Sequence, residues 1–326
     1  MTALERPGAG PLVSIVTPTL NRAAYLRWTI NSIRNQTYPN LEHLVMDGGS
    51  ADGTLDLLRA VEGAYRMRWQ SKRDEGMYQA INAGLASTEG EILAYLNSDD
   101  LYFPWTIQTV VDAFLRNPDV DFIYGDALAV DDETGQTIAY FMQPFDLDFI
   151  QRIGFLAQPA VFWRRRAFED VGPFDESLRY VADCDYWMRA GAHHRFLKVD
   201  EFLAIERLHR GTLREAIGGP LWKELERVRS KYVTLTGPDH DQRVADHGYR
   251  RTHYERRYKL YILLQSYLPK RWRRGRWSRI LNSRLVKVER FRYVLRALIL
   301  GAAVPGLRRW TRRAFLRADR SILEPR

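Results

Sequence analysis

The chain has 326 residues, enough for one large domain or two ordinary ones, and its 45% hydrophobic content is ordinary for a globular protein. Its single cysteine, Cys184, excludes an intramolecular disulfide and indicates a reducing compartment. The net charge of +9 is unevenly distributed. Residues 221–326 hold 28 Lys and Arg against 9 Asp and Glu, a net charge of +19, which leaves a net charge of −10 for residues 1–220. This asymmetry predicts an acidic body with a basic extension that binds an anionic partner.

The first part of the chain alternates buried-strand patterns with helical patterns. The expected strands cover about 12–17, 41–46, 65–70, 91–96 and 122–124, and the expected helices about 22–35, 54–61, 77–86 and 105–116. Repeated strand–helix units at this spacing predict an α/β fold with a Rossmann-like, mainly parallel sheet covered by helices. The turn after the first strand, 17–21, lacks the G-x-G-x-x-G fingerprint, which argues against an NAD-type enzyme.

The pattern changes after residue 126. Two short segments flank the run Asp131–Gly135, as in a hairpin, and a mixed region leads to a helical pattern at Asp183–Arg189. Beyond about Pro220 the chain reads as helical, basic and rich in aromatic residues. We therefore expect one domain at 1–219, with halves of about 11–126 and 127–219, followed by a basic helical region at 220–326.

Two adjacent carboxylates, Asp99 and Asp100, follow the apolar run 92–96. Carboxylates at the carboxyl end of a buried strand repel each other and resist desolvation, and ligands of open α/β sheets bind at that edge. A divalent cation (Mn or Mg) that carries a diphosphate would offset the cost, because hard cations bind one or two carboxylates plus phosphate oxygens. The alternative is a solvated turn whose Asp caps the next helix.

Seven short motifs occur in a fixed order along the first 210 residues. They are Ser14-Ile-Val-Thr-Pro-Thr-Leu-Asn21, Gln36-Thr-Tyr-Pro-Asn40, Asp47-Gly-Gly-Ser-Ala-Asp-Gly-Thr54, Asp74-Glu-Gly-Met-Tyr-Gln-Ala-Ile-Asn-Ala-Gly84, Leu96-Asn-Ser-Asp-Asp100, and Val171-Gly-Pro-Phe-Asp-Glu176 ahead of Ala182-Asp-Cys-Asp185. Together they resemble a family 2 glycosyltransferase of the GT-A fold. The resemblance implies transfer of a sugar from a nucleotide diphosphate-sugar to an acceptor hydroxyl, with inversion at the anomeric carbon.

The same resemblance assigns roles on the donor side. Asp100 would hold the metal, and Asp99 would contact the ribose or assist the ion. The nucleotide pocket would be lined by Thr17, Pro18, Asn21, Asp47 and Asp74. For Asp47, as for Asp52, turn chemistry or a helix cap stays open as an alternative.

Two positions depart from the family pattern. Asn97 stands where many relatives have another Asp, and Gly48 stands where they often have a second acidic residue. The second departure leaves the nucleotide open among UDP-, GDP- and dTDP-linked donors.

The acceptor hydroxyl needs a base, and Asp183 is our prediction. On a helix, Asp185 and Arg189 are four residues apart and can pair, which would make Asp185 structural. Asp183 lies at the helix start and can face the cleft, although a role as helix cap stays open. Cys184 is expected to pack as a small apolar residue rather than act as a nucleophile.

His209 follows the last segment that matches the family. Relatives often place a histidine there near the metal or the diphosphate, so His209 is a candidate metal ligand. A solvated surface histidine is the alternative.

The basic region interleaves Trp with cations at 270–277 and 308–313, around an apolar stretch at 297–307 that is too short to span a bilayer. Basic segments with Trp at the boundary suit an anionic membrane surface. Binding of single-stranded nucleic acid and a merely solvated helical face are the alternatives, and no nucleic-acid partner is expected because the rest of the chain is acidic.

Together these features predict a metal-dependent inverting glycosyltransferase that acts in cell-envelope polysaccharide, exopolysaccharide or glycolipid synthesis, with a carbohydrate or lipid-linked acceptor. Because residues 1–10 lack the apolar core of a secretory signal, we expect a cytoplasmic protein, peripheral at the inner face of the cell membrane. The alternative function is a non-catalytic sugar-nucleotide or nucleic-acid binding protein with a basic tail.

Overall fold

The computed structural model describes residues 10–135, 137–210 and 219–248. The compact unit that contains them extends to Gly248. The Trp-rich basic segments therefore lie outside the described residues, and the membrane prediction stays a prediction.

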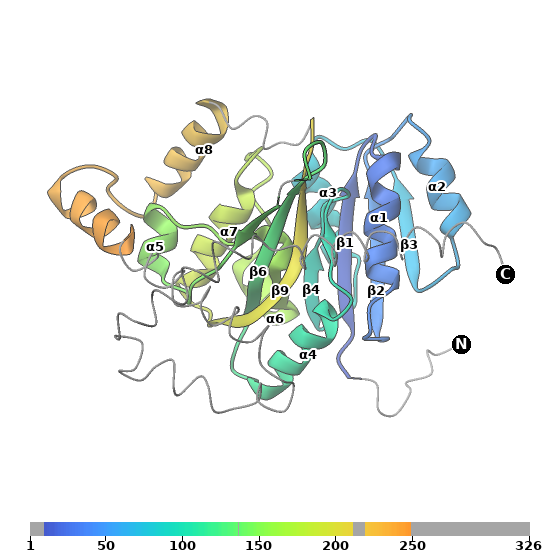
Figure 1. Cartoon of the computed structure of the whole chain (residues 1–326), viewed down its shortest axis with the longest axis horizontal. Helices are drawn as coiled ribbons and strands as arrows, with labels where there is room; N and C mark the ends of the chain where they lie inside the picture. The colour runs from blue at the N-terminus through green and yellow to red at the C-terminus, as the bar shows by residue number, and fades with distance from the viewer. Residues whose placement is uncertain (1–9, 136, 211–218, 249–326) are drawn as a thin grey trace, which may run out of the picture. The chain divides into compact units, whose positions relative to one another are not determined.

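The first half alternates strands and helices closely as predicted (Figure 1). In order, its elements are β1 (Val13–Thr19), α1 (Ala23–Arg34), β2 (Leu41–Asp47), α2 (Thr54–Val61), β3 (Met67–Ser71), α3 (Met77–Ala86), β4 (Ile92–Tyr95), β5 (Leu101–Tyr102) and α4 (Thr106–Arg116). Each predicted helix lies within two residues of an observed one, because the apolar stripes on these helices are regular.

The second half is less regular. Its elements are β6 (Phe122–Asp131), β7 (Thr137–Tyr140), α5 (Leu147–Arg152), a short 3₁₀ helix η1 (Gln158–Ala160), β8 (Val161–Arg164), α6 (Arg165–Val171), α7 (Ala182–Gly191), β9 (Phe196–Leu208) and α8 (Gly219–Arg229). Residues 238–248 are helical as well. The expected hairpin is present, since β6 and β7 pair antiparallel across a turn in which Thr134 donates to Asp131.

All strands join one sheet in the order β3-β2-β1-β4-β8-β6-β9-β5, with β7 paired to β6. The β3-β2-β1-β4 part is parallel throughout, as predicted. Beyond β4 the sheet is mixed, because β8 runs antiparallel to both its neighbours while β6 and β9 are parallel to each other. The α/β prediction is thus confirmed, and the mainly parallel sheet is limited to the first four strands in this order.

β6 continues seven residues past its predicted end at Tyr124. Gly125 interrupts the apolar pattern, but it lies at a register irregularity between β6 and β9. A Cβ at this position would lie 2.7 Å from both the Glu201 carbonyl oxygen and the Leu203 side chain. The glycine therefore allows a close approach of two strands, and it does not end the strand.

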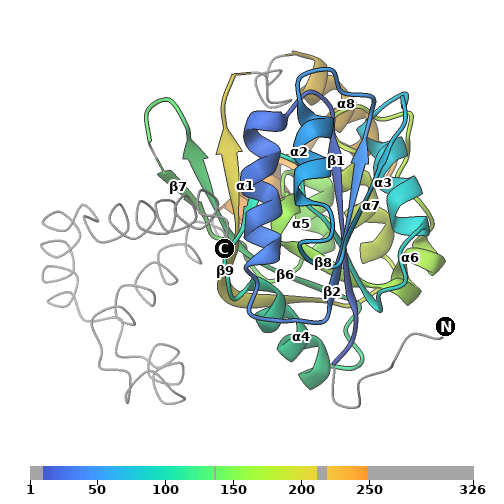
Figure 2. The ribbon, with the colours of Figure 1, turned by 90° about the vertical axis from the view of Figure 1, so that its right-hand side faces the viewer.

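Helices cover both faces of the sheet (Figure 2). On one face, Leu26 and Ile30 of α1 and Leu58 of α2 pack on Val45 of β2. On the other face α3 packs so closely that a Cβ on Gly84 would lie 2.5 Å from Val16 of β1. This double cover leaves the carboxyl ends of β1 and β4 as the open edge where a ligand can bind.

Candidate active site

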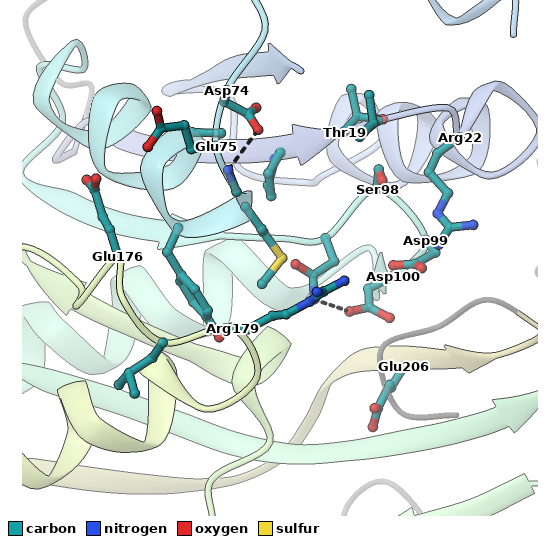
Figure 3. A pocket seen from close by; sticks show the side chains of 18 of the residues that line it. Thr19, Arg22, Asp74, Glu75, Ser98, Asp99, Asp100, Glu176, Arg179 and Glu206 are labelled. Carbon is teal, nitrogen blue, oxygen red and sulfur yellow. Dashed lines mark hydrogen bonds between the residues drawn. The ribbon is translucent and has the colours of Figure 1, made fainter. Parts of the chain in front are cut away.

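A pocket of about 730 Å³ lies at that edge (Figure 3). Five segments line it: the end of β1 with the turn after it, the loop before α3 with the start of that helix, the turn after β4, the loop before α7, and β9. Six of its lining residues are acidic and three are arginines. The acidic ones are Asp74, Glu75, Asp99, Asp100, Glu176 and Glu206, and the basic ones are Arg22, Arg179 and Arg207.

The turn after β4 holds the adjacent carboxylates in place. Thr29 of α1 donates its hydroxyl to the carbonyl oxygens of Ser98 and Asp100, both at 2.9 Å. The Asp100 carboxylate is buried and accepts from the backbone N–H of Arg207 at 3.1 Å. Burial, with the charges of Asp99 and Glu206 beside it, holds the pKa of Asp100 well above its usual range.

A bound metal ion would offset the cost of burying the charged Asp100 carboxylate. Among the residues that the structure describes, no three His, Cys, Asp or Glu side chains are arranged to hold a metal. Two neighbouring carboxylates and a third nearby nonetheless suit a hard cation that takes its other ligands from a bound diphosphate. The chemistry of these carboxylates therefore fits a hard divalent cation.

His209 is buried and lies against Asp99, not Asp100. Its Nε2 is 3.1 Å from Asp99 Oδ2, its Nδ1 is 2.9 Å from the carbonyl oxygen of Arg210, and its ring stacks on Tyr25 with centroids 3.9 Å apart. The alternative of a solvated surface histidine is thus wrong. The predicted role as metal ligand stays a prediction.

Asp183 lies in the first turn of α7, as predicted. Burial, with a smaller contribution from the nearby charge of Glu206, raises the pKa of its carboxyl to about 6. Asp183 does not itself line the pocket, but Tyr78 does, and the Asp183 charge adds to the burial that raises the pKa of Tyr78. A carboxylate poised near neutral pH next to a pocket is suited to proton transfer.

Asp185 is held as a structural group. Arg189 donates to its Oδ2 at 2.8 Å, and Lys231 and Tyr232 reach its Oδ1 at 3.4 and 3.3 Å. Arg189 also donates to the carbonyl oxygens of Val171 and Pro173. The predicted pairing of Asp185 with Arg189 is confirmed.

The structure separates the predicted nucleotide-pocket residues into two groups. Pro18 and Asp74 line the pocket, as does Asp99. Thr17 is fully buried with its hydroxyl 2.8 Å from Nε2 of His43, so it supports the pocket from below the surface. Asn21, in the left-handed backbone region at φ 52°, accepts from the backbone N–H of Ala51 and fixes that turn.

Asp47 has the turn role that was left open for it. Its Oδ2 accepts from Gly49 N, Ser50 N and Ser71 Oγ at 3.1, 3.0 and 2.6 Å, while its Oδ1 is buried without a partner among the described residues. Asp52 likewise accepts from Thr54 and from the first residue of α1, Ala23. Nucleotide contact by Asp47 stays a prediction.

The sequence analysis assigned no role to six charged residues of the pocket: the arginines Arg22, Arg179 and Arg207, and the acidic residues Glu75, Glu176 and Glu206. Glu206 and Arg207 lie three and two residues before His209. The resemblance therefore pointed to this segment, but only through its histidine. Arg22 and Arg179 are single arginines in loops, without any local pattern that marks them.

Comparisons with known proteins show the family of the chain. The family described as Glycosyl transferase family 2 matches residues 14–172. A "PGL/p-HBAD biosynthesis glycosyltransferase" of Mycobacterium bovis is 34% identical over 184 residues, which cover 56% of this chain and 70% of the relative. An uncharacterised glycosyltransferase of Rickettsia typhi is 30% identical over 193 residues, 55% of this chain and 58% of that protein. The chain belongs to glycosyltransferase family 2 and is a glycosyltransferase.

Solved structures support the fold. Residues 1–349 of Staphylococcus aureus TarS, in complex with UDP-GlcNAc, align with a TM-score of 0.57 at 19% identity, over 72% of this chain and 71% of that chain. At this identity the likeness shows the fold alone, which is of the GT-A type, as predicted.

Proposed function

We propose that the chain transfers a sugar from a nucleotide diphosphate-sugar to an acceptor hydroxyl, with inversion at the anomeric carbon. The observation that carries the proposal is the placement of two carboxylate centres: buried Asp100 beside Asp99 in the pocket, and Asp183 next to the pocket-lining Tyr78, with a pKa of about 6. The mycobacterial relative is named for PGL/p-HBAD biosynthesis, and this name supports the proposal of a lipid-linked or carbohydrate acceptor in cell-envelope polysaccharide, exopolysaccharide or glycolipid synthesis.

In this proposal each side of the pocket has its own task. Asp74 and the end of β1 hold the nucleoside, and Arg22 and Arg179 face the diphosphate. Asp100, assisted by Asp99, would hold a divalent cation (Mn or Mg), which supplies positive charge to the departing diphosphate. His209 would support the same group through its contact with Asp99.

The transfer step is a single displacement at the anomeric carbon. Asp183 accepts the proton of the acceptor hydroxyl as the acceptor oxygen bonds to the anomeric carbon from one face. The bond between that carbon and the diphosphate oxygen breaks on the opposite face, and the nucleoside diphosphate leaves with the bonding electron pair. Because the new bond forms opposite the old one, the configuration inverts.

A direct test combines the purified chain with UDP-, GDP- and dTDP-linked sugars and Mn²⁺. Thermal shifts with the nucleoside diphosphates identify the donor, because a ligand of the native state raises its stability. Transfer to a lipid-linked or saccharide acceptor is then followed by NMR of the anomeric proton. An α-linked donor should give a β-linked product, and retention of configuration would exclude the mechanism.

We also propose that the basic region holds the enzyme at an anionic membrane surface on the cytoplasmic side. Its net charge of +19 over residues 221–326 and its interleaved Trp residues support this. Within the described part of the chain, no helix has the length and apolar character to cross a membrane. Replacing the five Lys and Arg residues of segment 270–277 by glutamine should release the full-length chain from vesicles that contain phosphatidylglycerol. Unchanged sedimentation with the vesicles would exclude this segment as the membrane contact.

A further inference from the structure

The loop between α6 and α7 contributes four pocket residues, Glu176 to Arg179, and ends at Val181, where α7 begins. Its first part is anchored by Asn82 of α3. The Asn82 side chain accepts from Phe174 N and donates to Phe174 O, both at 2.9 Å. Asn82 also donates to Glu176 Oε1 at 2.9 Å, so the donor-side helix α3 fixes the first part of this loop.

The end of the loop is held by a residue from α8. The two carboxylate oxygens of Glu224 accept from three successive backbone N–H groups, those of Arg179, Tyr180 and Val181, at 3.0, 2.6 and 3.2 Å. The side chain of Val181 makes no capping bond to α7. Glu224 thus supplies, from 43 residues away, the anion that a helix start favours, through charge-assisted hydrogen bonds.

α8 is itself firmly placed. Leu225 and Val228 are buried in the main core. Arg229 donates to the carbonyl oxygen of Gly154 at 2.6 Å, and Tyr232 reaches Asp185 of α7. A carboxylate on so well anchored a helix has a defined position, which a flexible surface glutamate would not have.

We propose that Glu224 is a positioning residue for sugar transfer, which rests on the function proposed above. By fixing residues 179–181 it places Arg179 in the pocket and sets the start of α7, two residues before Asp183. The segment after residue 219 is then part of the catalytic unit, although it lies outside the residues that match the family.

The experiment compares full-length Glu224→Ala and Glu224→Gln with Glu226→Ala, an exposed glutamate on the same helix, as control. Glu224→Ala should lower kcat at least about tenfold and raise the KM for the acceptor, because small displacements of catalytic groups are costly. Its Kd for the nucleoside diphosphate should rise by less than kcat falls, at most about threefold, because Arg179 is displaced while Arg22 and the nucleoside side of the pocket lie on other elements. Glu224→Gln keeps one accepting oxygen and should fall between the wild type and Glu224→Ala.

Amide hydrogen exchange gives a second, activity-independent readout. Glu224→Ala should speed exchange in peptides that cover 176–186 and leave those that cover 92–100 unchanged. If Glu224→Ala shows normal sugar transfer and normal amide exchange, the proposal is wrong. Equal losses of transfer, nucleotide binding and melting temperature would also overturn it, because they would indicate a general structural role for Glu224. If Glu224→Ala does not fold, Glu224→Gln decides on the same criteria. A wild-type chain that transfers no sugar would defeat the proposed function, and the positioning role with it, while faster exchange at 176–186 would still show that Glu224 holds the loop.

Discussion

The two sides of the pocket are built in different ways. On the donor side, the turn after β2 is held by a local carboxylate, because Asp47 accepts from the backbone N–H groups of Gly49 and Ser50. On the acceptor side, the key contacts join residues far apart in the chain, such as Glu224 with Arg179 and Asn82 with Phe174. Local contacts leave a pattern in the sequence, and distant contacts leave none.

The comparison also separates two kinds of carboxylate. Asp100 is buried beside other acidic groups, an arrangement that a cation would stabilise, whereas Asp183 is half-buried near Tyr78 and has a pKa of about 6. The donor side should therefore respond to metal, and the acceptor side to pH. We therefore expect substitutions on the donor side to change metal-dependent nucleotide binding, and substitutions on the acceptor side to change the pH dependence of transfer.

The largest expected effect is on transfer by Asp183→Asn. Asparagine caps a helix about as well as aspartate, so the variant should fold and bind the donor nucleotide normally. Its amide cannot accept the acceptor's proton, so transfer should fall by at least about a hundredfold. Initial rates at saturating donor measure this, and near-full turnover would exclude Asp183 as the base.

The pH dependence of the wild type checks the same assignment. A base with a pKa of about 6 is active only when deprotonated, so kcat should be lost as the pH falls through about 6 and be level above it. Asp183→Asn should lack this limb in its residual activity. A wild-type profile that is level down to pH 5 would contradict the assignment.

The next effect is on the donor side. Asp100→Ala should weaken nucleoside diphosphate binding at least about tenfold in Mn²⁺, since even partners of metal ligands are worth that much. In EDTA its affinity should equal that of the wild type. Calorimetric titration measures both, with the exposed Asp56→Ala as control, and equal affinity of Asp100→Ala and wild type in Mn²⁺ would exclude the metal role.

The sequence alone predicted that four carboxylates of the donor side lie at one edge of the sheet, because each follows a strand pattern closely in the chain, which is a local signal. Asp47, Asp74, Asp99 and Asp100 follow strands whose apolar runs are plain, so their meeting at one edge could be inferred. The interpretation of Asp183 rested on the helix spacing of Asp185 and Arg189, which is also local. Glu224 could not be predicted, because the spatial approach of α8 to the start of α7 depends on the folded core.

A moderate effect, on stability rather than rate, is expected on the acceptor side for Asp185→Asn. It weakens the bonds to Arg189, Lys231 and Tyr232 around a buried carboxylate, so it should cost about 1–3 kcal/mol of unfolding free energy. Specific activity of the folded protein should stay within a few-fold of wild type. Urea unfolding with parallel rate measurements checks this, and a loss of rate without a loss of stability would give Asp185 a chemical role.

The smallest effect concerns Gly48, where relatives often carry an acidic residue. A Cβ at Gly48 would lie 2.8 Å from Asp74 Oδ2, so Gly48→Ala must displace the carboxylate that lines the nucleoside end of the pocket. Stability should change little, because the displaced group is the end of a surface side chain. Nucleoside diphosphate binding should weaken about 3- to 10-fold, the range expected when two residues in contact are coupled.

A double-mutant cycle of Gly48 and Asp74 tests whether the collision causes the weaker nucleotide binding. In an Asp74→Ala background the collision is gone, so Gly48→Ala should change the nucleotide Kd by less than about twofold. An equal loss with and without Asp74 would mean that Gly48 acts through the backbone of its turn instead. If the effect of Gly48→Ala disappears in the Asp74→Ala background, Gly48 and Asp74 act as one unit. The glycine, which stands where the family pattern often has a second carboxylate, then leaves room for the carboxylate of Asp74 in the pocket.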